Sequence, residues 1–101
     1  MVEINWTNEA QIWLKDIYDY IALDKKSIAK KVVSEIFNKV QILQSFPKIG
    51  YEYPNTENKE IRILLYGHYR IAYLIKDEKS IDILGVFHGA LEIERYLWIL
   101  V

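Results

Sequence analysis

The chain contains no cysteine among its 101 residues and only two histidines. It therefore forms no disulfide, no thiolate nucleophile and no cysteine-based zinc site, and this fits a protein of a reducing compartment. Long apolar runs are also missing. The longest one, residues 96–101, is far shorter than the roughly 20 residues that cross a bilayer. Since the chain also begins without a basic segment followed by an apolar one, we expect a cytoplasmic protein with no membrane contact.

Strong net charge is absent as well. Thirteen basic and fourteen acidic side chains give a formal net charge of -1, which is not the signature of a small nucleic-acid-binding domain. Apolar residues make up 51% of the chain and aromatic residues 14%, which is enough to fill a core and too much for a disordered tail. We predict a single domain over residues 1–101.

The charges that are present are unevenly distributed. Residues 1–24 carry five acidic side chains and one lysine, whereas residues 25–48 carry six lysines and one glutamate. Adjoining segments of this kind are usually two solvated helix faces that attract each other. The alternative is a basic surface that meets an acidic partner or a phosphate backbone. The densest part of that surface is formed by Lys25, Lys26, Lys30 and Lys31.

Two stretches have apolar residues at helical spacing. The first predicts an amphipathic helix over about residues 8–22. The second predicts a helix that Asp24 or Ser27 caps and that stops at Phe46-Pro47. Because the link between them is very short, the two helices should run antiparallel as a hairpin.

Elsewhere apolar and polar residues alternate with a period of two, which predicts strands. One short strand precedes the helices, and three more follow the irregular segment 47–58 and are joined by short turns. The predicted strands cover residues 2–6, 61–65, 69–75 and 81–88, and a short helix follows from Gly89. The expected fold is α+β, in the order β-α-α-β-β-β plus a short C-terminal helix, with the helix hairpin packed on an antiparallel sheet.

Motifs for metal, nucleotide or nucleophilic catalysis are absent. The sequence has no HExxH, no GxxxxGK[ST], no GxGxxG and no nucleophile elbow, so we expect no metal and no cofactor. The remaining candidates for chemistry are Arg62, Arg70 and His88, which all fall on predicted strands.

An arginine in an otherwise apolar strand needs a carboxylate, a phosphate or water around its head. One interpretation of Arg70 is therefore structural, with an ion pair to Glu60, Asp82 or a carboxylate of the hairpin, while His88 caps the following turn. The other interpretation is functional. Arg62 and Arg70 would then bind phosphate, and His88 would transfer a proton in RNA cleavage through the 2′-hydroxyl.

Taken together, several short motifs resemble a known family. In order, they are Trp6-Thr7-x-x-Ala10, Asp16-Ile17-x-x-Tyr20-Ile21, Phe46-Pro47-x-x-Gly50, Ile61-Arg62-Ile63, Tyr69-Arg70-Ile71-Ala72-Tyr73 and Ile83-Leu84-Gly85-Val86-Phe87-His88-Gly89. Their order and spacing resemble the ParE/RelE superfamily of toxins from bacterial type II toxin–antitoxin modules, often labelled plasmid stabilisation proteins. The resemblance covers nearly the whole chain and implies a helix hairpin on a mostly antiparallel sheet, as the periodicity does.

The resemblance also implies a partner, because these toxins are held inactive by a cognate antitoxin that wraps the toxin surface. Antitoxins are frequently acidic, so the lysines at positions 25, 26, 30 and 31 are the expected docking surface, with the apolar sheet face and the apolar tail as further candidates. An assembly with the antitoxin is expected.

The superfamily divides by mechanism. RelE-like members cut mRNA on the ribosome with basic residues on the sheet, whereas ParE-like members inhibit DNA gyrase and usually lack that set. Arg70 matches the shared Tyr-Arg motif and Arg62 a basic position, but isoleucines at 61 and 63 flank Arg62 where a nuclease would have further basic residues. The ParE-type ending usually contains a run with an arginine, and in this sequence Ala90-Leu91-Glu92 stands in its place.

Net charge favours one branch over the other. A nuclease that engages ribosomal RNA gains affinity by neutralising several phosphates, and a domain at -1 is poorly equipped for that. The sequence therefore favours a ParE-like gyrase inhibitor without enzymatic activity. The alternative is a RelE-like mRNA endonuclease that uses Arg62, Arg70 and His88, and a third is a binding module without toxicity.

Overall fold

The computed structural model describes residues 1–54, 58–89 and 93. Its elements are β1 (Glu3–Trp6), α1 (Asn8–Ala22), α2 (Lys26–Val40), one 3-10 turn (Gln41–Gln44), β2 (Tyr51–Glu52), β3 (Glu60–Tyr66), β4 (Tyr69–Ile75) and β5 (Ser80–His88). The predicted α+β order is confirmed, and the short strand β2 is added to it. The helix expected from Gly89 onward falls, except for Gly89 and Ile93, outside the described residues.

The five strands of the described residues form one sheet in the order β1-β5-β4-β3-β2. Neighbours from β2 to β5 run antiparallel, as predicted for the three-stranded meander. However, β1 pairs parallel with β5, from Glu3 opposite Ser80 to Trp6 opposite Ile83, so the sheet is mixed rather than wholly antiparallel. Short turns fix the neighbours of β3, β4 and β5, whereas nothing in the alternation of β1 specifies its partner.

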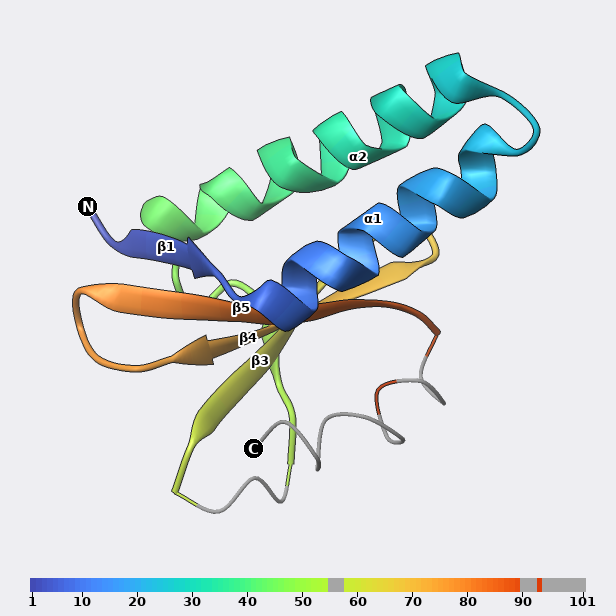
Figure 1. The fold of residues 1–101 in the computed structure, drawn as a ribbon. Helices are drawn as coiled ribbons and strands as arrows, with labels where there is room; N and C mark the ends of the chain where they lie inside the picture. Colours follow the sequence, from blue (N-terminus) through green and yellow to red (C-terminus); the bar gives the residue numbers. More distant parts are fainter. Residues whose placement is uncertain (55–57, 90–92, 94–101) are drawn as a thin grey trace.

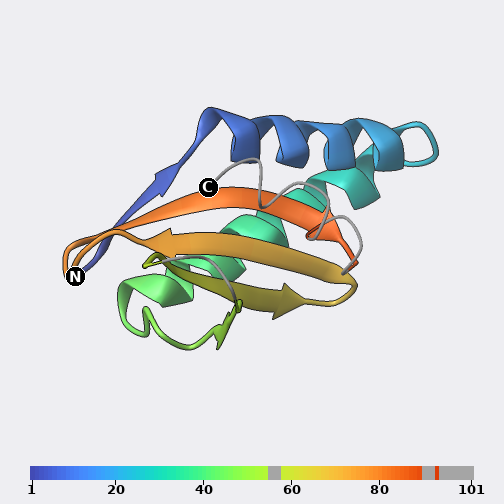
Figure 2. The ribbon, with the colours of Figure 1, turned by 90° about the horizontal axis from the view of Figure 1, so that it is seen from below.

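Both helices lie on one side of the sheet (Figure 1). Figure 2 shows α1 running along the β5 side, where β1 has already ended and the edge of β5 would otherwise be open. There the Trp13 ring meets the Phe87 ring edge-on, with 4.9 Å between their centroids. In both views the tip of the helix hairpin extends past the end of the sheet (Figures 1 and 2).

The start of α1 is held by Thr7. Its hydroxyl oxygen accepts a hydrogen bond from the Ala10 N–H at 3.1 Å and its O–H donates to the Ile83 carbonyl at 2.7 Å. One side chain therefore caps the helix and ties it to β5. The second helix has no side-chain cap, because Lys25 occupies that position, so the prediction that Asp24 or Ser27 caps it is wrong.

Apolar residues are buried on both faces of the sheet. The cluster under the helices includes Ile36, Leu43, Ile71, Tyr73 and Ile83. A second cluster on the opposite face comprises Ile61, Ile63, Ala72, Leu84, Phe87 and Ile93. A strand residue of the first cluster points toward the helices, and a strand residue of the second cluster points to the opposite face. The immediate neighbours of each residue along its strand point the other way.

Tyr73 is the largest fully buried side chain of the described residues, and it anchors the segment before β2. Its hydroxyl accepts a hydrogen bond from the Gly50 N–H at 3.0 Å and donates one to the Pro47 carbonyl at 2.8 Å. Burial raises the pKa of this hydroxyl above its ordinary value of 10.0, so it remains a donor at any physiological pH. The segment from Pro47 to Gly50 is thereby fixed to the centre of the sheet.

Candidate functional site

Arg62 on β3 is held by neighbouring groups of the protein. Its Nε donates to Glu60 at 2.8 Å, while one terminal nitrogen donates to the Lys48 carbonyl at 3.1 Å and the Gly50 carbonyl at 2.7 Å. Glu52 lies 3.5 Å from the other terminal nitrogen. Only 15% of the side chain is exposed. The guanidinium is therefore occupied by structural contacts and joins β3 to the segment that precedes β2.

Arg70 lies on the opposite face of the sheet. In antiparallel strands, residues directly opposite each other point the same way, and Arg62 is opposite Tyr73, which belongs to the helix-side core. Arg70 is opposite Leu65 and two residues from Ala72, which belongs to the other cluster. The predicted phosphate-binding pair of Arg62 and Arg70 is thus not formed.

The expected ion pairs of Arg70 are also absent within the described part of the chain. Its guanidinium donates to the Tyr51 hydroxyl at 2.8 Å. Glu60 binds Arg62 instead, and Asp82 lies 3.7 Å from Lys76. Arg70 is half-buried on an otherwise apolar face, held by a neutral partner.

His88 ends β5 on the helix side of the sheet, opposite Tyr69. Its ring centroid lies 5.4 Å from that of Tyr69 and 6.1 Å from that of His68 in the β3–β4 turn. The side chain lines a cavity beneath α1 that neither arginine reaches. The three residues considered for RNA cleavage therefore occupy three separate places, and the structure does not bring them together.

The four lysines expected to face an acidic partner are all exposed at the start of α2. None of Lys25, Lys26, Lys30 and Lys31 is in an ion pair with a described residue, whereas Lys15, Lys48 and Lys76 each lie within 4.0 Å of a carboxylate. We call these four residues the lysine face. It is a concentration of positive charge that the described part of the fold leaves uncompensated.

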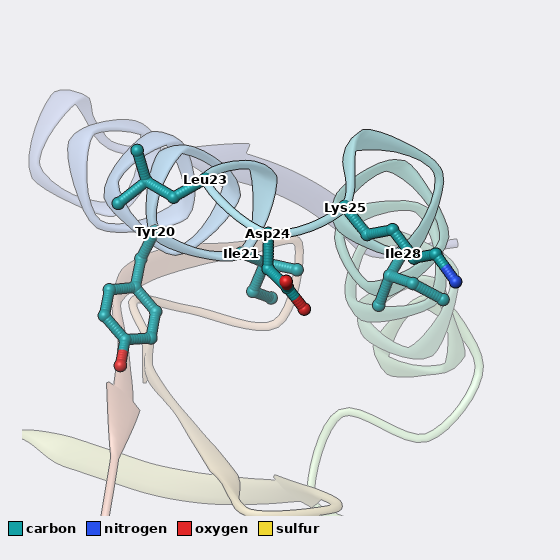
Figure 3. Close-up of a pocket in the computed structure, with 6 residues that line it drawn as sticks. All are labelled: Tyr20, Ile21, Leu23, Asp24, Lys25 and Ile28. Carbon is teal, nitrogen blue, oxygen red and sulfur yellow. The ribbon is translucent and has the colours of Figure 1, made fainter.

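Two adjoining cavities follow α1, and nothing in the periodicity of the sequence predicts them. The larger, about 530 Å³, lies at the hairpin tip between the ends of the two helices (Figure 3). The smaller, about 340 Å³, lies between α1 and the ends of β4 and β5. Tyr20 and Ile21 line both cavities, so the two cavities together form one groove. The only sequence signal is that Tyr20 stands beside the apolar stripe of its helix rather than in it.

The hairpin is tied to the sheet near this groove. The Tyr66 hydroxyl at the end of β3 donates a hydrogen bond to Glu35 of α2. That bond to the Glu35 carboxylate raises the pKa of Tyr66. Glu35, the one acidic residue of the lysine-rich segment, is thus engaged with the sheet, which leaves the lysine face without a nearby counter-charge on its own helix.

The described residues show no centre for a metal. Across residues 1–54, 58–89 and 93, no three His, Asp or Glu side chains gather as a metal site would require. In the same residues no helix has the length and apolar character needed to cross a membrane. What these residues offer is surface: a basic helix face, an apolar groove and a half-buried arginine.

Comparison with known proteins assigns this architecture to a family. A family model described as the ParE toxin of the type II toxin–antitoxin system parDE matches residues 4–92. Among solved structures, the chromosomal ParDE system of P. aeruginosa is similar, with a TM-score of 0.73 and 28% sequence identity over 89% of this chain and 98% of that chain. A search of curated protein sequences gives no match.

These findings place the fold in the class of type II toxin–antitoxin proteins. Within that class, the chain belongs to the ParE toxin family. The resemblance seen in the sequence motifs is confirmed, and so is the expected fold of a helix hairpin on the sheet.

Proposed function

We propose that this protein inhibits DNA gyrase by direct protein–protein binding, as expected of a ParE-like toxin, and that a cognate antitoxin neutralises it. The observation that carries the proposal is the separation of Arg62, Arg70 and His88. Cleavage through a 2′-hydroxyl needs a proton-transfer group and a phosphate-binding group at one point in space. Among the described residues these candidates lie on different faces or ends of the sheet, with Arg62 already bonded to Glu60.

The gyrase part of the proposal is tested with two assays on the purified protein. We expect inhibition of plasmid supercoiling by gyrase, and no cleavage of mRNA on translating ribosomes. The Arg70→Ala and His88→Ala variants should inhibit supercoiling as the unaltered protein does. Ribosome-dependent cleavage that both substitutions abolish, with supercoiling untouched, would establish the nuclease alternative instead.

The antitoxin part of the proposal rests on the lysine face. Four exposed lysines lie within seven positions at the cap and first turns of α2, and none is in an ion pair with a described residue. Such a surface favours an acidic segment of a partner protein. The antitoxin is expected to be encoded in the reading frame beside that of this chain. Its binding is measured with both purified proteins, or by co-purification from cells that express the two together.

Charge reversal on this face should weaken antitoxin binding. For Lys26→Glu with Lys30→Glu we expect Kd to rise by about tenfold or more at low salt, because two attractions become repulsions. The difference should shrink as salt is raised to several hundred millimolar. Lys79→Glu is the control for the single variant Lys30→Glu, since it makes the same charge change at an exposed lysine in the β4–β5 turn. An equal loss of affinity in both variants would show that net charge, not the lysine face, sets the affinity for the antitoxin.

A further inference from the structure

The helix hairpin carries opposite charges on its two helices and leaves most of them unpaired. Residues 8–24 have four acidic side chains and one lysine, whereas residues 25–40 have five lysines and one glutamate. Among the described residues, the one ion pair of the hairpin joins Lys15 to Asp19 inside α1. No carboxylate of α1 is paired with a lysine of α2 there, although the two helices pack side by side (Figure 1). The hairpin therefore presents a negative and a positive helix to any partner that packs on it.

The exposed side of α1 combines apolar and acidic residues. Ile12, Asp19 and Leu23 stand at positions i, i+7 and i+11, which share one side of a helix. Ile12 is 60% exposed and Leu23 87%, and Asp19 is exposed between them. Figure 3 shows Leu23 pointing away from the sheet, whereas Tyr20 points toward it. This stripe of α1 is therefore on the outside of the hairpin, where no described residue covers it.

The exposed side of α2 combines apolar and basic residues at matching intervals. Lys26, Lys30 and Phe37 stand at positions i, i+4 and i+11 and also share one side of their helix. Both lysines belong to the lysine face, and Phe37 is 45% exposed. The Phe37 ring stacks on the Trp6 ring, with 5.9 Å between the centroids, so the stripe borders the start of α1. Two neighbouring stripes of opposite charge, each with apolar residues, thus lie on one hairpin.

We propose that these two stripes bind a second copy of this chain, so that two hairpins form a two-fold-symmetric bundle of four helices. A partner of one charge would match one helix of the hairpin and be repelled by the other. A second copy, turned about a two-fold axis parallel to the helices, matches both, because α1 of each copy then lies antiparallel on α2 of the other. The proposal goes beyond the proposed function and does not depend on it.

The register of the hairpin brings complementary side chains together across this axis. The helices meet at the tip, where α1 ends at Ala22 and α2 begins at Lys26. Counting back from the tip along both helices gives the residues at nearly equal height, within about one helical rise of 1.5 Å. The same heights apply between the two copies, and the stripes then meet in three facing pairs of matching chemistry: Asp19 with Lys30, Ile12 with Phe37, and Leu23 with the apolar stem of Lys26.

The size of the surface indicates a weak dimer. Each helix has 15 residues and is therefore about 22 Å long, and two helices side by side are about 20 Å wide. The contact area is then roughly 450 Å² per copy in projection, below the roughly 800 Å² per partner of a standard interface. We therefore expect a dimer with a Kd in the micromolar range, on the order of 1 to 100 μM.

A charge swap tests the contact between Asp19 and Lys30. Asp19→Lys puts like charges at both symmetric contacts of the dimer, and so does Lys30→Glu. Each variant alone should therefore dimerise about tenfold or more weakly at low salt. Mixed in equal amounts, the two variants should form a heterodimer with a Kd within about threefold of that of the unaltered dimer, because both contacts again join opposite charges. Sedimentation velocity over a concentration series measures all three.

The same charge changes away from the hairpin are the controls. Glu78→Lys and Lys79→Glu alter exposed residues of the β4–β5 turn and should leave the dimer Kd within about twofold. Asp19→Lys also removes the surface ion pair with Lys15, which contributes little to stability. All four variants should keep the far-UV circular dichroism and the melting temperature of the unaltered protein, since the changed side chains are exposed.

The apolar contacts are tested separately. Ile12→Ser with Leu23→Ser should weaken the dimer about tenfold or more, because each lost contact occurs twice by symmetry. Leu65→Ser is the control for a single apolar loss, since Leu65 is 51% exposed on β3, away from the hairpin. It should not change the dimer Kd.

Three results would overturn the proposal. The first is a protein that stays monomeric up to about 0.5 mM. The second is a dimer that neither Asp19→Lys nor Lys30→Glu weakens, which would place the contact on another surface. The third is weakening in both variants without recovery on mixing, which would show that the two side chains do not face each other. Because the dimer is measured without the antitoxin and without gyrase, its failure leaves the proposed function standing, and failure of the proposed function leaves the dimer standing.

Discussion

Alanine in place of Gly50 will destabilise the protein by about 2 to 4 kcal/mol, which combines the cost of overpacking with that of strained hydrogen bonds. A Cβ atom at this position would lie 2.7 Å from the Ile63 carbonyl oxygen and 2.8 Å from the Tyr73 hydroxyl. Neither neighbour can move away easily, because the Ile63 carbonyl belongs to the backbone of β3, which is paired on both sides, and Tyr73 is fully buried. The loss should lower the melting temperature by roughly 10 to 25 °C for a domain of this size.

Gly67 supplies the control for this prediction. It has a positive φ of 56° in the β3–β4 turn, but no atom lies within 4 Å of a Cβ built there. Gly67→Ala should therefore cost only about 1 kcal/mol, which is the penalty of the left-handed backbone alone. The two variants are compared by thermal and urea unfolding. A melting temperature of Gly50→Ala equal to or above that of Gly67→Ala would contradict the close packing seen at Gly50.

This arrangement gives a physical reason for one of the sequence motifs. In Phe46-Pro47-x-x-Gly50, the carbonyl of Pro47 and the N–H of Gly50 both bond to the hydroxyl of Tyr73. Tyr73 is itself the last residue of the Tyr69-Arg70-Ile71-Ala72-Tyr73 motif. Two motifs that seem independent in the sequence therefore meet in one contact, and the glycine is needed because any side chain would separate them.

The separation of the two sheet arginines follows from the turn between their strands. A two-residue turn at Gly67-His68 fixes Tyr66 opposite Tyr69, and the whole β3–β4 register follows. That register sets Arg62 opposite Tyr73 and Arg70 opposite Leu65, which puts the two arginines on different faces. Because side chains alternate with a period of two, counting outward from the turn separates the pair from the sequence alone, and the expectation that they bind one phosphate overlooked that count.

Other features are beyond such counting. The pairing of β4 with β5 shifts between Ala72 and Tyr73, because Leu84 is an extra residue of β5 between Ile83 and Gly85. Gly85 beside it is the one sign of this bulge in the sequence, and a glycine in a strand does not by itself fix where the register shifts. The strand that pairs with β1 depends on how the helix hairpin, which follows β1, packs on the sheet. That packing is a property of the whole fold. The groove likewise arises from the position of α1 against the ends of β4 and β5, so its lining residues come from elements far apart in the sequence. Periodicity indicates which face of an element is apolar, but it does not indicate whether another element covers that face.

The two sheet arginines should respond very differently to removal. Arg62→Ala is expected to cost about 2 to 4 kcal/mol, because it leaves the Lys48 and Gly50 carbonyls without their donor and the half-buried Glu60 carboxylate with only the Lys48 ammonium group at 4.0 Å. Arg70→Ala removes one hydrogen bond to the exposed Tyr51 and should cost less than about 1 kcal/mol. Thermal and urea unfolding of the two variants measures the difference.

Arg62→Lys distinguishes loss of geometry from loss of charge. A lysine keeps the cation beside Glu60, but its single ammonium group cannot reach that carboxylate and the two carbonyls in the directions that the planar guanidinium serves. We therefore expect Arg62→Lys to recover less than half of the stability lost in Arg62→Ala. Full recovery would mean that Arg62 contributes charge alone. The hydrogen bonds between β3 and the segment at Gly50 would then no longer explain why an arginine occupies position 62. Binding of an anionic partner would become the better explanation.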